Sequence, residues 1–494
     1  MPLSVSLGVP LRLPLRVPLG LRQRRIALMG LAKAFRRAFG PRPDRPPSEI
    51  LDLSWIDEFI DNVRPYVFVR LEDNLLIKRP NQAQKLNPQG AALLKDLLDG
   101  RSISRVLDEI GRSPERIRDV ALFMVEVRRS LEGRLDEGTA SPAVEVEPFD
   151  MRFSKLPILS EVAITYRCNL RCSFCYAGCN CTTNPAGDDR EMTGREIREV
   201  LGKIFEEGKV PSVSFTGGEP TLRHDLPELV RHASDLGMRV NLITNGNLVD
   251  ERLASVLAQS GLDSAQVSLE GVTAETHDRV TAVAGSFSKS LAAVEHLDRA
   301  GVHVHTNTTI NRDNLHECGR MPSFVQDRLG RERFSMNLLV PTGSATLNTG
   351  LAVPYSEIGP HLERIHAESR RVGVEFMWYS PVPMCMFNSV AHGLGNKGCS
   401  ACDGLLSVAA NGDVLPCSSY DESVGNLLEH GVEAVWDSHR ATQHREKYLA
   451  HPECRKCPEF EICHGACPLY WREFGFGELQ RSQGFGPVDM GRFE

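Results

Sequence analysis

Cysteine is absent from a long N-terminal stretch, since the earliest of the fourteen cysteines is Cys168. No apolar segment approaches the ~20 residues that a membrane-spanning helix needs, so we expect no membrane association. An excess of positive charge is also lacking. The formal net charge is −7, which argues against a nucleic-acid-binding protein. The 494 residues, 41% hydrophobic and 24% charged, predict a soluble chain of about two to four domains.

Acidic residues are missing from the N-terminus, where the first is Asp44. The same stretch is rich in arginine, and its regularly spaced prolines exclude a regular helix: Pro10, Pro14 and Pro18. We expect residues 1–47 to be a disordered leader or the result of a start site placed too far upstream, with Met29 as the alternative start. A transit peptide is the competing interpretation.

The cysteines are separated by short intervals of the C-x2-C and C-x3-C type, among glycines and prolines. No secretory signal precedes them, so a disulfide framework of the secreted kind is not expected. Thiolates at such intervals favour metal or iron–sulfur ligation in a reducing compartment. We therefore expect a cytoplasmic protein that holds clusters.

Composition and periodicity divide the remaining chain into five regions. Residues 48–135 show helical apolar periodicity, and residues 136–155 form an acidic linker. Residues 156–380 alternate strand and helix patterns. Residues 381–476 are rich in cysteine and glycine, and residues 477–494 form a tail.

The region 156–380 has the pattern of an α/β fold. Strand–helix repetition with right-handed crossovers produces a parallel sheet, either open or curled toward a barrel. In such sheets the loops that follow the strands carry the chemistry. The predicted strands are Glu161–Thr165, Ser212–Thr216, Arg239–Thr244, Ala265–Leu269, Val302–Thr309 and Phe334–Val340.

Cys168, Cys172 and Cys175 directly follow the first predicted strand, with Phe174 before the last cysteine. Three thiolates can bind three irons of a cubane cluster and leave the fourth iron open. An open iron can take the amine and carboxylate of S-adenosylmethionine (SAM). A zinc knuckle and a redox-active cysteine pair are the alternatives. In this form the run resembles that of the radical SAM superfamily.

The resemblance implies a partial (β/α)6 barrel and a [4Fe–4S] cluster on these three cysteines. It also implies SAM as the cofactor that yields a 5′-deoxyadenosyl radical. After the second predicted strand, a turn resembles the one that meets the methionyl amine of SAM: Gly217, Gly218, Glu219 and Pro220. Glycines permit close backbone approach, and Glu219 would accept a hydrogen bond from the ammonium.

Three further residues resemble SAM-contacting positions of the family. Ser268 and Glu270 lie at the end of the fourth predicted strand. The family usually has aspartate where Glu270 stands, so Ser268 is the stronger candidate. Asn307 ends the fifth strand, in a segment that resembles those lining the adenine. Ordinary buried strand ends are the alternative interpretation. The sequence identifies no general base, so the catalytic residues stay unassigned.

A second cysteine pattern lies near the C-terminus. It reads Cys402-x9-Gly412-x4-Cys417, then Cys454-x2-Cys457-x5-Cys463-x3-Cys467. The pattern resembles the SPASM domain, a C-terminal extension of radical SAM enzymes that holds auxiliary iron–sulfur clusters.

The resemblance implies two ligand groups. One cluster would use an upstream cysteine together with Cys402, Cys417 and Cys467. For the upstream ligand we prefer Cys399 over Cys385, because Cys399-x2-Cys402 is a chelating pair. The other cluster would use Cys454, Cys457 and Cys463.

The family usually supplies one more cysteine after Cys467, but residues 468–494 contain none. The second auxiliary cluster would then have three thiolates, with Cys385, an oxygen or nitrogen ligand, or substrate at the fourth iron. A structural zinc at Cys454 and Cys457 is an alternative. Three cysteines fit neither pattern and are expected to be ordinary thiols: Cys179, Cys181 and Cys318.

The N-terminal region contains a short strand-like stretch, Tyr66–Lys78, followed by helical segments with a turn at Asp99–Ser102. This arrangement resembles the PqqD-like peptide-recognition module, an α+β, winged-helix-like unit. The resemblance implies that a leader peptide adds a strand to the edge of its sheet. A structural cap is the alternative interpretation.

Together these features predict a maturase that oxidatively modifies or crosslinks a ribosomally made precursor peptide by radical chemistry. Flavodoxin or ferredoxin is the expected electron donor. Modification of a sulfatase active-site residue or of a tetrapyrrole side chain is the first alternative. A non-catalytic iron–sulfur protein that binds peptides or transfers electrons is the second. The intact cysteine triad and the turn at residues 217–220 argue against the non-catalytic alternative.

Overall fold

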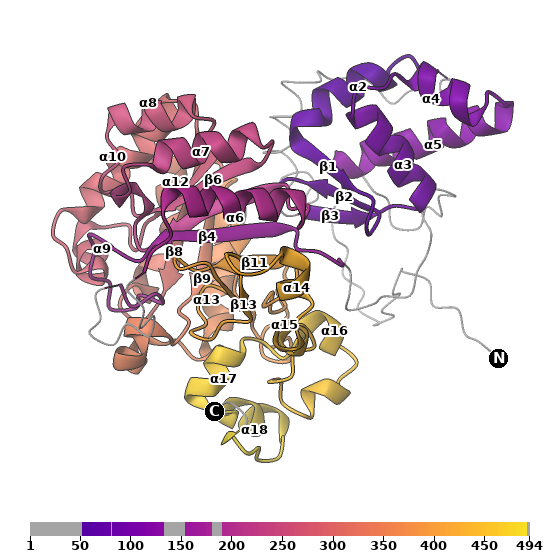
Figure 1. Cartoon of the computed structure of the whole chain (residues 1–494). Coiled ribbons are helices and arrows are strands. Elements are labelled where there is room, and N and C mark those ends of the chain that lie inside the picture. Colours follow the sequence, from indigo (N-terminus) through magenta and orange to yellow (C-terminus); the bar gives the residue numbers. More distant parts are fainter. Residues whose placement is uncertain (1–51, 81, 133–153, 180–189, 492–494) are drawn as a thin grey trace. The chain divides into compact units, whose positions relative to one another are not determined.

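The structure is a computed structural model, and it describes residues 52–80, 82–132, 154–179 and 190–491. These residues divide between Lys155 and Leu156 into two compact units, each considered by itself (Figure 1). The expected leader, nearly all of the expected linker and Cys181 lie outside the described residues. Within the described ranges, no helix combines the length and apolar character needed to cross a membrane.

The N-terminal unit contains a three-stranded antiparallel sheet in the order β1-β2-β3, with strands Val67–Arg70, Leu75–Lys78 and Gln82–Lys85. Its α-helices are α2 (Ile56–Val63), α3 (Pro88–Leu98), α4 (Ile103–Ile110) and α5 (Pro114–Leu131). The side chains of Asn87, Ser102 and Ser113 cap the N-termini of α3, α4 and α5. Leu94, Val106 and Met124 belong to the apolar core of this unit.

The stretch Tyr66–Lys78, predicted as one strand-like segment, forms two antiparallel strands joined by a turn. A buried ion pair occupies this turn. The Arg70 guanidinium donates two hydrogen bonds of 2.8 Å to the Asp73 carboxylate, and both side chains are 0% exposed. The Asp73 Oδ2 atom also accepts a hydrogen bond from the backbone N–H of Lys155 at 3.0 Å. The turn is therefore fixed by charge-assisted bonds that a hydrophobicity pattern does not reveal.

The second unit is built on one ten-stranded sheet in the order β10-β9-β8-β7-β6-β5-β4-β11-β12-β13. Each pair of neighbours from β10 to β11 is parallel, which confirms the predicted α/β fold. The parallel strands are β4 (Leu159–Thr165), β5 (Ser212–Gly217), β6 (Arg239–Thr244), β7 (Ser264–Ser268), β8 (His303–Ile310), β9 (Arg333–Leu338), β10 (Glu375–Trp378) and β11 (Leu405–Val408). The order ends at β10 and β13, so the described strands form an open sheet.

Helices follow most of the parallel strands. They are α6 (Gly194–Glu206), α7 (Leu226–Asp235), α8 (Glu251–Gln259), α9 (Ala274–Thr281), α10 (Ser286–Arg299), α11 (Leu315–Cys318), α12 (Met321–Asp327) and α13 (Tyr355–Val372). Val162 and Ile164 of β4 belong to the same apolar core as Val200 of α6 and Leu229 of α7. Because strand side chains alternate between faces, Glu161 and Ala163 project toward the opposite face. That face lies beside the loop that follows β4.

The cysteine-rich region continues the same sheet. Strand β11 pairs in parallel with β4, while β12 (Asp413–Leu415) and β13 (Gly425–Asn426) extend the sheet in antiparallel fashion. Its short helices are α14 (Val432–Trp436), α15 (His439–Arg445), α16 (Phe460–Cys463), α17 (Pro468–Phe474) and α18 (Gly477–Gln483). Within α18, Leu479 is buried and Glu478 accepts a hydrogen bond from the backbone N–H of Ser356. The C-terminal region therefore shares its framework with the strand that precedes the cysteine triad.

Candidate functional site

The cysteine triad lies in an irregular loop directly after β4. The backbone N–H of Leu170 donates to Cys168 Sγ at 3.4 Å, and the N–H of Cys175 donates to the carbonyl of Cys172 at 3.3 Å. All three thiols are free and partly exposed. Burial raises the pKa of Cys168 and of Cys172. The loop thus presents three thiols that form no disulfide bond. Three free thiols are the donor set that a cubane with one open iron requires.

The glycine turn after β5 is locked against this loop. The N–H of Gly218 donates to the Thr165 carbonyl at 2.8 Å, and the N–H of Glu219 donates to the Arg167 carbonyl at 2.8 Å. A Cβ atom added at Gly217 would lie 2.1 Å from the Thr165 oxygen, and one at Gly218 would lie 2.3 Å from the Arg167 oxygen. No side chain fits between these two backbones, so the sequence must have glycine at both positions.

The carboxylate of Glu219 is fully buried and joins three parts of the site. Its Oε1 atom accepts from the Thr221 hydroxyl at 2.5 Å and from the Thr244 hydroxyl at 2.7 Å. Its Oε2 atom accepts from the backbone N–H of Asn245 at 2.8 Å. Burial raises the pKa of Glu219, and these hydrogen bonds oppose the rise. Oε2 has one donor, so it retains a lone pair that could accept from an ammonium.

The ends of β7 and β8 bring the other SAM-contact candidates together. Ser268 and Asn307 are directly paired across these strands. The Asn307 amide donates to Asn337 Oδ1 at 2.8 Å and accepts from the Ser335 hydroxyl at 2.8 Å. Its side chain is therefore held in one orientation by β9.

Glu270 is buried beside the triad. Its Oε2 atom accepts from the backbone N–H of Thr309 at 2.9 Å, and burial raises the pKa of Glu270 to about 8. The charge of Glu270 contributes to the raised pKa of Cys172, after the larger effect of burial. Glutamate thus stands where the family usually has aspartate, and it keeps a carboxyl group at this position.

Cys179, expected to be an ordinary thiol, lies beside the triad. Its thiol hydrogen-bonds to Cys175 and lowers the pKa of Cys175 to about 6. The short interval Cys175-x3-Cys179 is the signal that could have indicated this neighbour. Cys318 is buried, and its thiol donates to the Asn314 carbonyl at 3.3 Å, as expected for a thiol in an apolar core.

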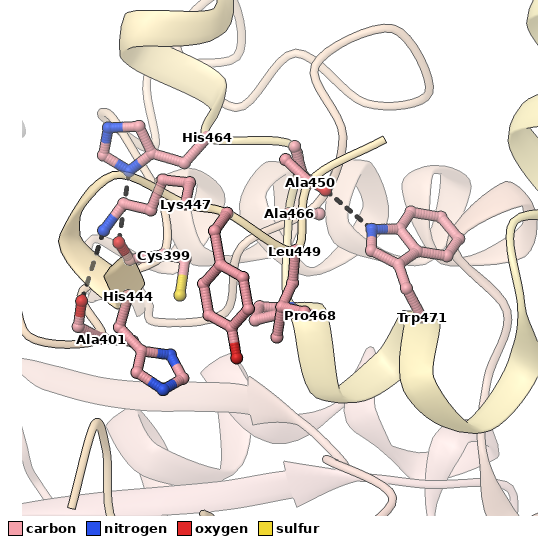
Figure 2. A pocket seen from close by; sticks show the side chains of 12 residues that line it. Cys399, Ala401, His444, Lys447, Leu449, Ala450, His464, Ala466, Pro468 and Trp471 are labelled. Carbon is pink, nitrogen blue, oxygen red and sulfur yellow. Dashed lines mark hydrogen bonds between the residues drawn. The ribbon is translucent and has the colours of Figure 1, made fainter. Parts of the chain in front are cut away.

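One thiol group forms around Cys399 in the C-terminal region. Charge on Cys399 contributes to the raised pKa of each of its neighbours, which are Cys402, Cys417 and Cys467. Cys399 lines a small pocket (Figure 2). In the same wall, His464 Nδ1 lies 3.2 Å from the Cys399 carbonyl and Lys447 Nζ donates to the Ala401 carbonyl at 3.4 Å. These four thiols are the ones that the sequence pattern assigned to one cluster.

A second thiol group forms around Cys454, whose pKa is raised to about 12 by burial and by its thiol neighbours Cys463, Cys385 and Cys457. Within the described ranges, no three His, Cys, Asp or Glu side chains are grouped so that they could hold a single metal ion. A cubane distributes its thiolates over separate irons, so the chemistry of both thiol groups suits iron–sulfur clusters.

A small pocket lies between the triad loop and the strands of the C-terminal region. Its wall includes Tyr176, which follows Cys175, and Ser418, which follows Cys417. Glu161 of β4 projects into this wall. Burial raises the pKa of Glu161, and a hydrogen bond from the Ser418 hydroxyl opposes the rise. The Ser407 hydroxyl, in the same wall, is buried without a hydrogen-bond partner.

Comparison with known proteins agrees with both cysteine patterns. Residues 162–321 match the Radical SAM superfamily, and residues 399–458 match the iron–sulfur cluster-binding SPASM domain. The chain is 30% identical over 325 residues to a PqqA peptide cyclase of Streptomyces rochei, covering 62% of this chain and 83% of that one. It is 28% identical over 333 residues to an AdoMet-dependent heme synthase of Methanosarcina barkeri, covering 63% and 90%.

The fold has a similar counterpart among solved structures. SuiB of Streptococcus suis, in its complex with the precursor peptide SuiA, aligns with a TM-score of 0.62 at 16% identity. The alignment covers 82% of this chain and 95% of SuiB. The two family matches and the relative at 30% identity lead to one conclusion. The chain belongs to the radical SAM superfamily, as an enzyme that uses a [4Fe–4S] cluster and SAM and carries a SPASM domain for auxiliary iron–sulfur clusters.

Proposed function

We propose that this enzyme oxidatively modifies a ribosomally made precursor peptide whose leader binds the N-terminal unit. The cysteine triad would hold the SAM-binding cluster, and the two C-terminal thiol groups would hold auxiliary clusters. When bound, these groups supply a 5′-deoxyadenosyl radical that removes a hydrogen atom from the substrate, and an acceptor for one further electron. The residues of the chain supply positioning, exclusion of water and transfer of a proton.

The extent of the likeness to SuiB is the observation that carries the peptide proposal. An alignment over 82% of the chain is longer than the second unit, which begins at Leu156, so it extends into the N-terminal unit. That unit has the α+β composition expected of a PqqD-like module. SuiB is described with a precursor peptide bound, and the PqqA peptide cyclase of S. rochei is also named for a peptide substrate.

Strand β3 offers an edge to which a leader could add. The N–H of Leu86 donates to the Asn74 carbonyl at 2.8 Å, so these opposed residues form a hydrogen-bonded pair. Hydrogen-bonded pairs alternate along an antiparallel ladder, so the N–H groups of Gln84 and Gln82 also point toward β2. The N–H groups of Ala83 and Lys85 then point outward, where carbonyl groups of an added peptide strand could accept hydrogen bonds from them.

The pocket between the triad loop and Ser418 suits the reacting residue of the peptide. It adjoins Cys175 through Tyr176 and Cys417 through Ser418, so it lies between two groups of cluster ligands. Glu161 provides a carboxylate in this wall. After a hydrogen atom has left the substrate, Glu161 would take up one proton, and an auxiliary cluster would supply the acceptor for one electron, so that the substrate loses two electrons in all. Flavodoxin or ferredoxin would supply the electron that cleaves SAM.

Modification of a tetrapyrrole is the second candidate, because AdoMet-dependent heme synthases are among the relatives that match at 28% identity. The two candidates differ in their use of β3, since a tetrapyrrole does not add a strand. Relatives of both chemistries match the chain at similar identity, and the outward N–H groups of β3 support the peptide candidate.

The leader proposal is tested on the full-length enzyme with synthetic peptides encoded by short reading frames beside the gene. Ala83→Pro removes one outward N–H and leaves the β2–β3 hydrogen bonds intact, since proline is tolerated at an edge strand. Ala83→Ser keeps the N–H and is the matched control. We expect Ala83→Pro to weaken peptide binding about tenfold, the loss of roughly one hydrogen bond, and Ala83→Ser to bind as wild type. Equal binding by both variants, or no binding of any such peptide, would contradict the leader proposal.

A further inference from the structure

The described residues contain one cysteine outside the SPASM spacing that nevertheless lies with the second thiol group. Cys385 follows β10 and precedes the whole SPASM pattern. The backbone N–H of Met384, the preceding residue, donates to Cys463 Sγ at 3.4 Å. Covalent geometry places the Cys385 Cα within about 5 Å of the Met384 nitrogen, so Cys385 is a direct neighbour of Cys463.

The segment around Cys385 is anchored on both sides. The Pro383 carbonyl accepts from the N–H groups of Met386 and Phe387 at 2.8 and 3.0 Å. Val382 and Phe387 are buried at 5% and 4% exposure. Cys385 itself is exposed at the tip of this turn. A thiol that projects from a fixed turn toward other cysteines needs little conformational ordering to become a ligand.

The other three cysteines are arranged by local backbone bonds. The N–H of Cys457 donates to the Cys454 carbonyl at 3.0 Å, and the N–H of Phe460 donates to the Cys457 carbonyl at 3.1 Å. Helix α16 then ends at Cys463. Burial raises the pKa of Cys385 to about 11, with contributions from the neighbouring thiols Cys463 and Cys457. Cys463 and Cys457 are also thiol neighbours of Cys454, together with Cys385.

Two polar side chains next to this group already have partners. Glu453, next to Cys454, forms an ion pair with Lys456 at 2.7 Å. His464, next to Cys463, directs its Nδ1 atom to the Cys399 carbonyl at 3.2 Å. Cys399 in turn belongs to the other thiol group, with Cys402, Cys417 and Cys467. Among the cysteines of residues 381–476, Cys385 is the one left to complete the second group.

We propose that Cys385 is the fourth ligand of the second auxiliary cluster, together with Cys454, Cys457 and Cys463. With four thiolates this cluster has no open iron. It transfers electrons and does not bind substrate, and the exposure of Cys385 and Cys457 places it near the surface.

This proposal rests on the second thiol group being a cluster site, which is part of the proposed function, but it does not depend on the identity of the substrate. The test uses the full chain with Cys168, Cys172 and Cys175 replaced by alanine, reconstituted anaerobically with iron and sulfide. This background removes the SAM-binding cluster and its open iron. Iron and sulfide content, Mössbauer and electron paramagnetic resonance spectra, and midpoint potentials are then measured, with and without an added small thiol.

We expect Cys385→Ala and Cys457→Ala to change the same one of the two cluster signals. In Cys385→Ala that cluster should shift to a higher potential, because a negative thiolate is lost, and should now respond to the added thiol. Cys385→Ser is the second variant, since an oxygen ligand can retain a cluster with an altered spectrum. Cys179→Ala, which removes a thiol outside both groups, is the control and should match the background.

Two results would overturn the assignment. In one, Cys385→Ala and Cys385→Ser both match the background in iron content, spectra and potential. In the other, they change the signal that Cys399→Ala changes, which would place Cys385 in the first group. Peptide modification is not measured in this test, so its outcome and that of the leader experiment are independent.

Discussion

The backbone N–H of Asn245, at the end of β6, donates to Oε2 of Glu219 at 2.8 Å, and this bond connects the glycine turn to the next strand end. The Asn245 side chain continues the connection, since its amide donates to Asn169 Oδ1 at 2.8 Å within the triad loop. A buried carboxylate thus links the turn that would receive SAM to the loop that would hold the cluster.

Replacing Glu219 should therefore affect both stability and SAM binding. Glu219→Ala leaves the Thr244 hydroxyl and the Asn245 N–H without their acceptor, and we expect a loss of about 2–4 kcal/mol in the free energy of unfolding. Glu228→Gln, which removes an exposed carboxylate on α7, should change stability by less than about 0.5 kcal/mol. Denaturant unfolding and calorimetric titration with SAM measure the two effects. A Glu219→Ala protein with unchanged stability would contradict the linking role.

Gly343 should control assembly of the triad cluster. Its φ of +57° favours glycine, and an added Cβ would lie 2.3 Å from the Tyr176 carbonyl and 2.5 Å from the Cys175 carbonyl. Gly343→Ala should displace the triad loop and reduce iron incorporation at the triad, while the auxiliary clusters keep their iron. Gly350→Ala is the control, because nothing lies within 4 Å of the added atom. Iron analysis and Mössbauer spectra report the result, and full triad occupancy in Gly343→Ala would refute it.

The partly buried His305 should make the enzyme less stable in acid. Burial, with Arg333 and Arg239 nearby, lowers the pKa of His305 to about 4, below its ordinary value near 6.5. The stability that neutral His305 contributes is present above about pH 6.5 and is lost as the pH falls toward 4. His305→Gln should remove up to about 3 kcal/mol of this acid dependence. The free energy of unfolding, measured across this pH range, tests the direction of the effect, and His303→Gln, at an exposed position, is the control. The same dependence of stability on pH in the wild type and in His305→Gln would contradict the prediction.

Glu161 should be needed after hydrogen abstraction and not for it. Glu161→Gln keeps the size of the side chain but removes the proton acceptor, so peptide product should fall about 100-fold. Formation of 5′-deoxyadenosine should stay close to the wild-type amount. Because burial raises the pKa of Glu161, product formation in the wild type should increase as the pH rises through that pKa. Glu275→Gln, an exposed change on α9, is the control. Equal losses of product and 5′-deoxyadenosine in Glu161→Gln would contradict the proton-accepting role and indicate a structural role for Glu161.

The sequence predicts those parts of the site whose spacing is local. The triad needs three cysteines within one loop, and the turn at Gly217 needs glycine because two backbones touch there. Strands β4 to β9 follow from runs of apolar residues. The segment Thr244–Gly246 resembles an ordinary turn in the sequence. Its connection to Glu219 emerges only when two strand ends lie side by side.

Contacts between distant segments could not be predicted in this way. The pairing of β11 with β4 joins the C-terminal domain to the strand before the triad, and no periodicity encodes it. Strand β10, Glu375–Trp378, is too short to be distinguished by its pattern. The grouping of Cys385 with Cys454 depends on the path of the chain after β10, whereas sequence spacing compares cysteines only with their near neighbours.

The most direct test of the account combines the full-length enzyme, reconstituted anaerobically, with SAM, dithionite and the precursor peptide encoded beside the gene. The account predicts release of 5′-deoxyadenosine together with a peptide lighter by two hydrogen atoms. Alanine at Cys168, Cys172 and Cys175 should abolish both products and leave the absorbance of the auxiliary clusters. Absence of 5′-deoxyadenosine from protein that contains its iron and sulfide would contradict the account, and so would release of 5′-deoxyadenosine with an unchanged peptide.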